Sequence, residues 1–208
     1  MSGSPRVALG LRSHSGWAAL VAVGASRGDS PVPSDPEVVL RRRIELADAS
    51  IEGSKQPYHE AEGKKPKEAE RIVGRCTDSS RRLAREAVWA VLVELRQRQH
   101  DVMGCGLLLA SGRPLPGNLH AILASHALIH AAEGEMYRDV LRRASEHFSL
   151  PVTGVRERDV LARAAEATGV AAPELQSRVA EMGRALGPPW RQDEKLATLA
   201  AWLVLAQA

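Results

Sequence analysis

The sequence predicts an α/β protein built on a five-stranded mixed sheet with helices on both faces, and three observations support this. Three apolar or alternating runs near the N-terminus are joined by turn residues, which is typical of an antiparallel meander. The later apolar runs alternate with helical patterns, as in crossover units. The chain also has 44 % hydrophobic and 25 % charged residues, the ordinary mixture of a globular protein with a core.

Five segments are expected to form the strands. Gly, Ser and Pro separate the first three, and the third is polar enough for an edge strand. The fourth is almost continuously apolar, as in a central strand buried on both faces. The expected strands are residues 6–11, 17–25, 38–46, 102–110 and 151–155.

A long helical pattern follows the third strand, from residue 67 to residue 99. Gly74 and the polar residues 77–80 are expected to divide it into two helices, the second capped by Asp78 or Ser79. The apolar stripe of this pattern consists of Ile72, Cys76, Leu83, Ala87, Ala90, Val91 and Leu95.

Further helices are expected after the fourth and fifth strands. Asn118 is a suitable cap for a helix that runs to about Phe148. The remaining helices are expected at residues 158–168, at 173–186 and from about Asp193 onward. Residues 49–66 combine Gly and Pro with Lys and Glu, which predicts a mobile loop within a single domain of residues 1–208.

The composition excludes several classes of protein. With 28 Lys and Arg against 25 Asp and Glu, the net charge of +3 lacks the strong basic excess of many nucleic-acid-binding proteins. No apolar run approaches the length of a membrane span, so no membrane partner is expected. Cys76 and Cys105 lack CxxC spacing, and the N-terminus does not resemble a signal peptide. These features predict a cytoplasmic protein with free thiols buried in its core.

The order of elements and two short motifs resemble a known superfamily. Near the N-terminus, Val7-Ala8-Leu9 leads through a turn to Gly16-Trp17; near the C-terminus, Leu186-Gly187 precedes Asp193-Glu194-Lys195-Leu196-Ala197. Together with the strand and helix order, these motifs resemble the ribonuclease-H-like superfamily, and within it the bacterial-type RuvC Holliday-junction resolvases. The resemblance spans most of the chain.

The resemblance implies a nuclease site that this sequence does not complete. Such nucleases hold two divalent metals with carboxylates on the first strand, on or after the fourth strand, and at the start of the final helix. Here residues 7–11 and 102–109 contain no acid, and only Asp193, with Glu194 beside it, matches a position of the family. A working two-metal nuclease site is therefore not expected, nor is a cofactor.

A polar cluster is expected on the helix that follows the fourth strand. At about 100° per residue, His126, His130 and Glu133 fall within an arc of about 60°, on the stripe expected to face the sheet. One hypothesis is that they bind a divalent metal. The favoured interpretation is that both imidazoles pair with the backbone or with Glu133 and hold the helix against the sheet. The other candidates are Glu133 and Asp193 as catalytic acids, and Tyr137, Arg12 and His14 as binding residues.

Three functions remain open. The favoured one is a ribonuclease-H-like domain without a working nuclease site that binds nucleic acid or acts as an assembly component. A divergent metal-dependent hydrolase or nuclease, using His126, His130 and Glu133 with Asp193, is the first alternative. The second alternative is a structural subunit that binds a protein partner. Self-association into a homo-oligomer is compatible with each of the three functions.

Overall fold

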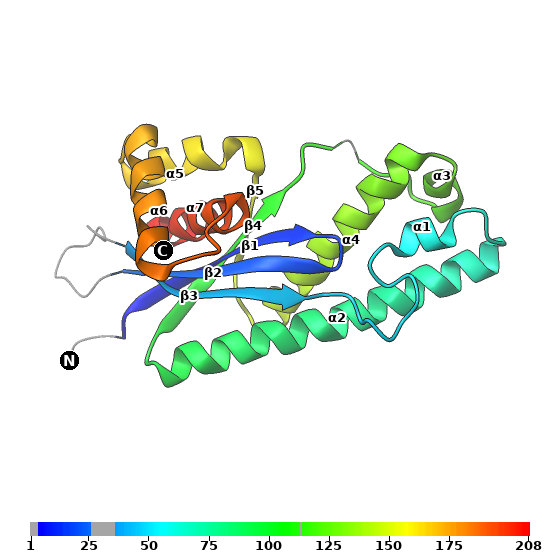
Figure 1. The fold of residues 1–208 in the computed structure, drawn as a ribbon, viewed down its shortest axis with the longest axis horizontal. Coiled ribbons are helices and arrows are strands. Elements are labelled where there is room, and N and C mark those ends of the chain that lie inside the picture. The colour runs from blue at the N-terminus through cyan, green and yellow to red at the C-terminus, as the bar shows by residue number, and fades with distance from the viewer. Residues whose placement is uncertain (1–3, 26–35, 113) are drawn as a thin grey trace.

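The fold was determined from a computed structural model that describes residues 4–25, 36–112 and 114–208 (Figure 1). The strands are β1 (Arg6–His14), β2 (Trp17–Ala25), β3 (Pro36–Glu45), β4 (Asp101–Leu109) and β5 (Val152–Arg156). The helices are α1 (Pro57–Ala61), α2 (Pro66–Gln97), α3 (Leu119–Leu123), α4 (His126–His147), α5 (Val160–Thr168), α6 (Ala172–Leu186) and α7 (Gln192–Gln207), with a 3₁₀ turn η1 at Glu157–Asp159.

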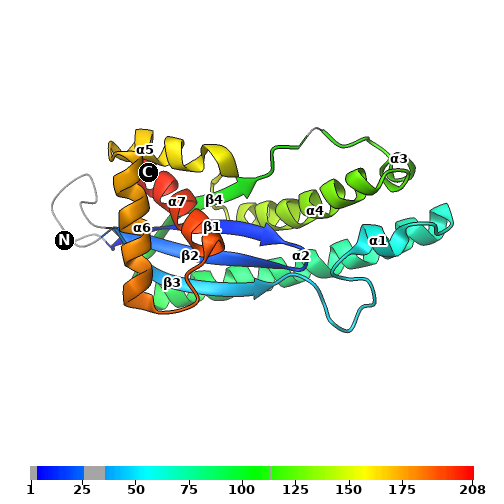
Figure 2. The same cartoon turned by 45° about the horizontal axis from the view of Figure 1, so that its top comes forward.

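The strands form one mixed sheet in the order β3-β2-β1-β4-β5. β1, β2 and β3 are an antiparallel meander, whereas β4 pairs parallel to β1 and β5 pairs parallel to β4. α2 and α4 cover one face of the sheet, and α7 covers the other beneath α5 and α6 (Figure 2). The predicted α/β class and mixed sheet are confirmed.

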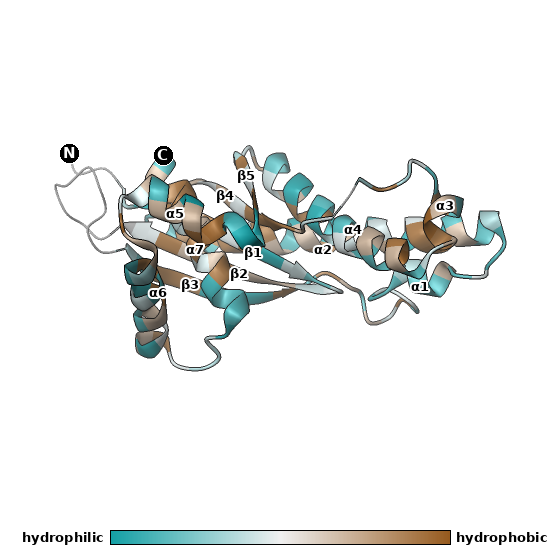
Figure 3. Cartoon of the chain, turned by 90° about the horizontal axis from the view of Figure 1, so that it is seen from above, coloured by the Kyte–Doolittle hydropathy of each residue, from teal (hydrophilic) through white to brown (hydrophobic). Residues whose placement is uncertain are grey.

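α7 is buried over most of its length because that part of the helix consists almost entirely of apolar residues, whereas its first turn is polar (Figure 3). Every residue from 197 to 205 is buried. Gly10 of β1 lets the helix approach closely, since a Cβ at this position would lie 1.8 Å from the carbonyl oxygen of Ala197. Gly106 of β4 does the same, with 2.3 Å to the carbonyl oxygen of Ala200. These two glycines fix the start of α7 beside the carboxyl end of β1.

The long helical pattern is one helix, so the predicted break at Gly74 and residues 77–80 is wrong. The side of Gly74 is open space, and its φ is not among the positive values. Packing of α2 against the sheet and α4 outweighs the weak helix propensity of these residues. Because the helix is continuous, Ala84 and Val88 are buried instead of the expected Leu83, Ala87 and Ala90.

The helix predicted from Asn118 to Phe148 is divided in two. Asn118 caps the first part, α3, by accepting a hydrogen bond at Oδ1 from the backbone N–H of Ala121 at 2.8 Å. The chain then turns at Ser125, whose extended backbone (φ −142°, ψ 119°) separates α3 from α4. His126 is therefore the first residue of α4.

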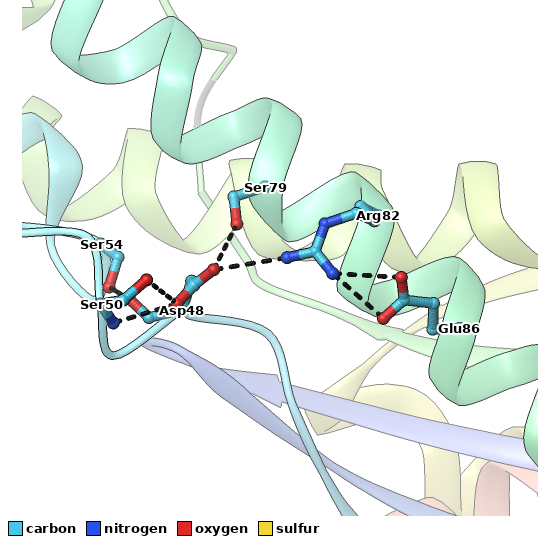
Figure 4. A network of polar contacts seen from close by, with 6 residues as sticks. All are labelled: Asp48, Ser50, Ser54, Ser79, Arg82 and Glu86. Carbon is cyan, nitrogen blue, oxygen red and sulfur yellow. Dashed lines mark hydrogen bonds and ion pairs between the residues drawn. The ribbon is translucent and has the colours of Figure 1, made fainter.

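The segment predicted as a loop, residues 49–66, contains the short helix α1. Its N-terminal part is anchored by buried Ser54, whose hydroxyl donates to the carbonyl of Asp48 at 2.6 Å. The Asp48 carboxylate in turn accepts hydrogen bonds from Ser50 and Arg82 (Figure 4). The prediction that residues 49–66 are irregular is wrong for α1. The mobility of this segment stays a prediction.

Both cysteines are buried and free, as predicted. Burial raises the pKa of the Cys105 thiol to about 12, so this thiol stays protonated at neutral pH. In the part of the chain that is described, no helix combines the length and the apolar character needed to cross a membrane.

Candidate functional site

The carboxyl end of β1 brings together four polar side chains. Successive β1 residues alternate between the two faces of the sheet, so Leu9 and Leu11 point into the core beneath α2 and α4. Arg12 and His14 lie on the opposite face, where they meet Asp193 from the first turn of α7. Glu157 joins them from η1, directly after β5. We name Arg12, His14, Glu157 and Asp193 the Arg12 cluster.

Arg12 is the centre of this cluster. Its guanidinium donates to both carboxylate oxygens of Glu157, from Nε to Oε1 at 2.7 Å and from Nη2 to Oε2 at 3.1 Å. The remaining Nη1 donates to Oδ1 of Asp193. The side chains of Arg12 and Asp193 are each 19 % exposed, whereas Glu157 is 43 % exposed. One guanidinium is therefore shared by two carboxylates and offsets half of their combined charge.

His14 is the second partner of Asp193, at 2.8 Å from Nε2 to Oδ1. Burial, and then the charge of Arg12, lowers the pKa of this imidazole. A carboxylate only accepts hydrogen bonds, so the neutral ring carries its proton on Nε2 and donates it to Asp193. The Arg12 cluster is thus internally paired.

An aromatic and cationic surface adjoins the Arg12 cluster. His14 stacks on Trp17 with ring centroids 4.3 Å apart and ring planes 10° apart. The guanidinium of Arg43 lies 3.9 Å from the centroid of the Trp17 ring. Arg43 and Arg41 share this face, whereas Arg42 points to the opposite face and pairs with Glu94 of α2. These three arginines thus alternate between the two faces of the sheet, as successive residues of a strand do.

Arg12 and His14 belong to a strand, although the sequence predicts a turn at these positions. β1 and β2 pair as far as His14 and Trp17, which leaves only Ser15 and Gly16 in the turn. Gly16 has a φ of +84°, a conformation that favours glycine. The tight hairpin extends the strand and directs both side chains toward α7.

A second cluster lies at the start of α4, where α1 packs against that helix (Figure 1). His59 of α1 joins His126 and His130 of α4, and one ligand atom from each of the three histidines lies within 4.8 Å of the others. The Nε2 atoms of His126 and His130 are 3.1 Å apart. The ring centroids are 4.5–5.2 Å apart, and each pair of rings is steeply inclined. We name His59, His126 and His130 the histidine cluster.

Glu133 is a buried residue of α4 that forms hydrogen bonds with His59 of this cluster. Its carboxylate is only 2 % exposed and accepts hydrogen bonds at Oε1 from the backbone N–H of His59 at 3.2 Å and from Nδ1 of the same residue at 2.9 Å. Glu133 is therefore buried, as its position on the helix predicts, but its partner is His59. The favoured pairing with His126 or His130 is wrong.

The structure also corrects the expected orientation of His126 and His130, which are exposed and do not face the sheet. Their neighbour is the His59 ring of α1. His59 itself was not predicted, because it lies in the segment expected to be a loop. Pro57 at the first turn of α1 is the local signal that predicts a helix there.

Tyr137 is fully buried one turn after Glu133. Its hydroxyl donates to the carbonyls of Ser54 at 2.7 Å and Lys55 at 3.1 Å. Burial and the nearby Glu133 raise the pKa of this phenol. Tyr137 thus holds the segment before α1 against α4.

Asp193 is not part of the histidine cluster. It pairs with Arg12 and His14, whereas Glu133 pairs with His59. The constellation of His126, His130, Glu133 and Asp193 that was considered for a hydrolase is therefore not assembled. Its members belong to two clusters on different elements of the fold.

The three-strand meander followed by two parallel crossover strands, with helices on both faces, is the ribonuclease-H-like fold. Among solved structures, the chain is similar to Thermus thermophilus RuvC, with a TM-score of 0.51 and 13 % identity over 97 % of this chain and 95 % of that chain. It is also similar to T. thermophilus RuvC in complex with a Holliday junction substrate, with a TM-score of 0.51 and 15 % identity over 95 % and 91 % of the two chains. No family model and no curated protein sequence matches.

The residues at the carboxyl end of β1 do not fit the two divalent metals that this fold implies. Two hard cations need several free oxygen ligands. The two carboxylates of the Arg12 cluster, Asp193 and Glu157, are bound to the Arg12 guanidinium. The one acid of β4, Asp101, is its first residue and lies at the opposite end of the strand.

Proposed function

We propose that this chain is a RuvC-like domain that binds nucleic acid and does not cleave it. The observation that carries the proposal is the position of Arg12, whose guanidinium lies between Asp193 and Glu157 at the carboxyl end of β1. Asp193 is the acid that, by the resemblance to RuvC-type nucleases, occupies the carboxylate position at the start of the final helix. An arginine is always charged, so it competes with metal ions for these carboxylates at every physiological pH.

The chemistry of in-line phosphoryl displacement supports the loss of cleavage. Two-metal nucleases use the metals to stabilise the attacking and the leaving oxygen. At the carboxyl end of β4, the residues are Leu107, Leu108 and Leu109, so this strand offers no carboxylate there. The guanidinium cation of Arg12 neutralises charge, but it cannot coordinate and activate the attacking water as a metal does.

The surface beside the Arg12 cluster supports binding. Arg43 is 56 % exposed and lies over Trp17, which stacks on His14. Trp17 holds Arg43 in place on this face, and an exposed guanidinium can bind a phosphate, so this surface suits the backbone of a nucleic acid. One of the similar solved structures holds a Holliday junction substrate, which makes branched DNA the first ligand to test.

The test is the affinity of the purified chain for a labelled four-way DNA junction, measured by fluorescence anisotropy against linear duplex. Arg43→Glu is expected to weaken junction binding about tenfold or more, and to flatten the dependence of affinity on salt concentration. Arg142→Glu is the matched control, because Arg142 is a 46 % exposed arginine of α4 on the opposite face of the sheet.

Two results would contradict this function. One is the absence of junction and duplex binding at low salt, which would favour a protein partner. The other is an equal loss of affinity in Arg43→Glu and Arg142→Glu, which would indicate general attraction to a charged surface.

A further inference from the structure

The histidine cluster has no role in the proposed function, and its residues belong to α1 and α4, whereas the Arg12 cluster is built from β1, η1 and α7. His126 and His130 are one helical turn apart, which places both rings on the same side of α4. Their Nε2 atoms are 3.1 Å apart. In a tetrahedral zinc site with Zn–N bonds of about 2.0–2.1 Å, two ligand nitrogens lie about 3.3 Å apart. The observed pair therefore already has the spacing of two zinc ligands.

His59 provides the third nitrogen from a separate element. Its ring lies 4.6 Å from the ring of His130 and 5.2 Å from that of His126, measured between centroids. Three imidazoles from α1 and α4 therefore converge from different directions, and sequence spacing within one helix does not explain this convergence. Within α4 alone, His126 and His130 lack a third nitrogen ligand, and His59 supplies it from α1.

Glu133 is an independent indication of a ligand. Its buried carboxylate accepts a hydrogen bond from Nδ1 of His59, so the proton of that ring is on Nδ1 and the lone pair is on Nε2. Histidines that bind metals commonly donate their other N–H to a carboxylate in this way, which fixes the ring and strengthens the ligand. The negative charge of Glu133 would also offset part of the charge of a cation.

We propose that His59, His126 and His130 bind one Zn²⁺ ion, with Glu133 as the residue that orients His59. Three neutral imidazoles are a ligand set that suits zinc, with a water molecule in the fourth position. That position is open to solvent because His126 and His130 are exposed. The site joins α1 to α4, so the ion would also hold the segment of residues 49–66 in place.

The test is a titration of the tag-free, metal-stripped chain with ZnCl₂ by isothermal titration calorimetry, with Co²⁺ absorption as a spectroscopic measurement of coordination. We expect one ion per chain and the intense visible bands of tetrahedral Co²⁺. His126→Ala and His130→Ala are each expected to reduce zinc affinity at least 100-fold. Since both side chains are exposed, both variants should fold, and their circular dichroism melts in chelator should match that of the wild type.

Two further variants separate this site from adventitious binding. His120→Ala removes an exposed histidine of α3 that is outside the cluster, and it should leave the affinity unchanged. Glu133→Gln should reduce the affinity about 10–100-fold while three histidines remain. Failure to bind zinc, or a loss below tenfold in both alanine variants of α4, would overturn the proposal. An equal loss in His120→Ala would do the same.

Discussion

Replacement of Arg12 by methionine tests the role of the Arg12 cluster in the fold. Methionine keeps most of the volume of the aliphatic stem but removes the guanidinium, so the pairs with Glu157 and Asp193 are lost. Glu157 is 43 % exposed, and solvent screening limits its share to about 0.5 kcal/mol. Arg12 and Asp193 are each 19 % exposed, and a charge-assisted hydrogen bond of this kind contributes about 1.5 kcal/mol.

The expected loss is therefore about 2 kcal/mol in the free energy of unfolding, or a fall of about 6 °C in Tm for a chain of this size. Urea denaturation of Arg12→Met, Asp193→Asn and the double variant gives the coupling between the two residues. The charge of Arg12 also lowers the pKa of His14, so that pKa should rise in Arg12→Met, as measured by NMR titration. A loss below about 0.5 kcal/mol, or an unchanged pKa, would refute the reasoning.

Two further predictions concern the same region. The pKa of His14 is lowered in the folded chain, so as the pH falls the unfolded chain takes up a proton first. The contribution of His14 to stability is therefore complete above pH 6.5 and is lost as the pH drops below that value. Urea denaturation at about pH 7.5 and about pH 5.5 should show this loss in the wild type and a smaller loss in His14→Gln. Gly10→Ala places a Cβ 1.8 Å from the carbonyl oxygen of Ala197, so α7 must move, and we expect a loss of about 3 kcal/mol or more in the free energy of unfolding. Thermal denaturation measures this loss. An unchanged Tm would be inconsistent with the close packing of α7 on β1.

The sheet could be predicted because its signals are local. Apolar runs of strand length and the order of elements identified all five strands, and their approximate positions agree with the structure. The errors arose where packing outweighs local propensity. α2 continues through Gly74, and α1 forms in a segment rich in Gly, Pro and charged residues. Both outcomes depend on contacts with α4 that lie far away in the sequence.

The candidate site was only partly predictable for the same reason. Helical periodicity identified Glu133 as buried, but its partner His59 lies 74 residues earlier in the chain. Likewise, Asp193 and Arg12 were both candidates, but their contact spans 181 residues and depends on the close approach of α7 to β1. Pairing of this kind follows from the topology of the sheet, which a single sequence does not specify.

The most direct test of the central claim is a cleavage assay on the same four-way junction, with the protein in excess and Mg²⁺ or Mn²⁺ present. We predict that native gels show bound junction and that denaturing gels show intact strands, because Arg12 holds the carboxylates that a metal would need. Strand cleavage that depends on the metal and is lost in Asp193→Asn would contradict the account.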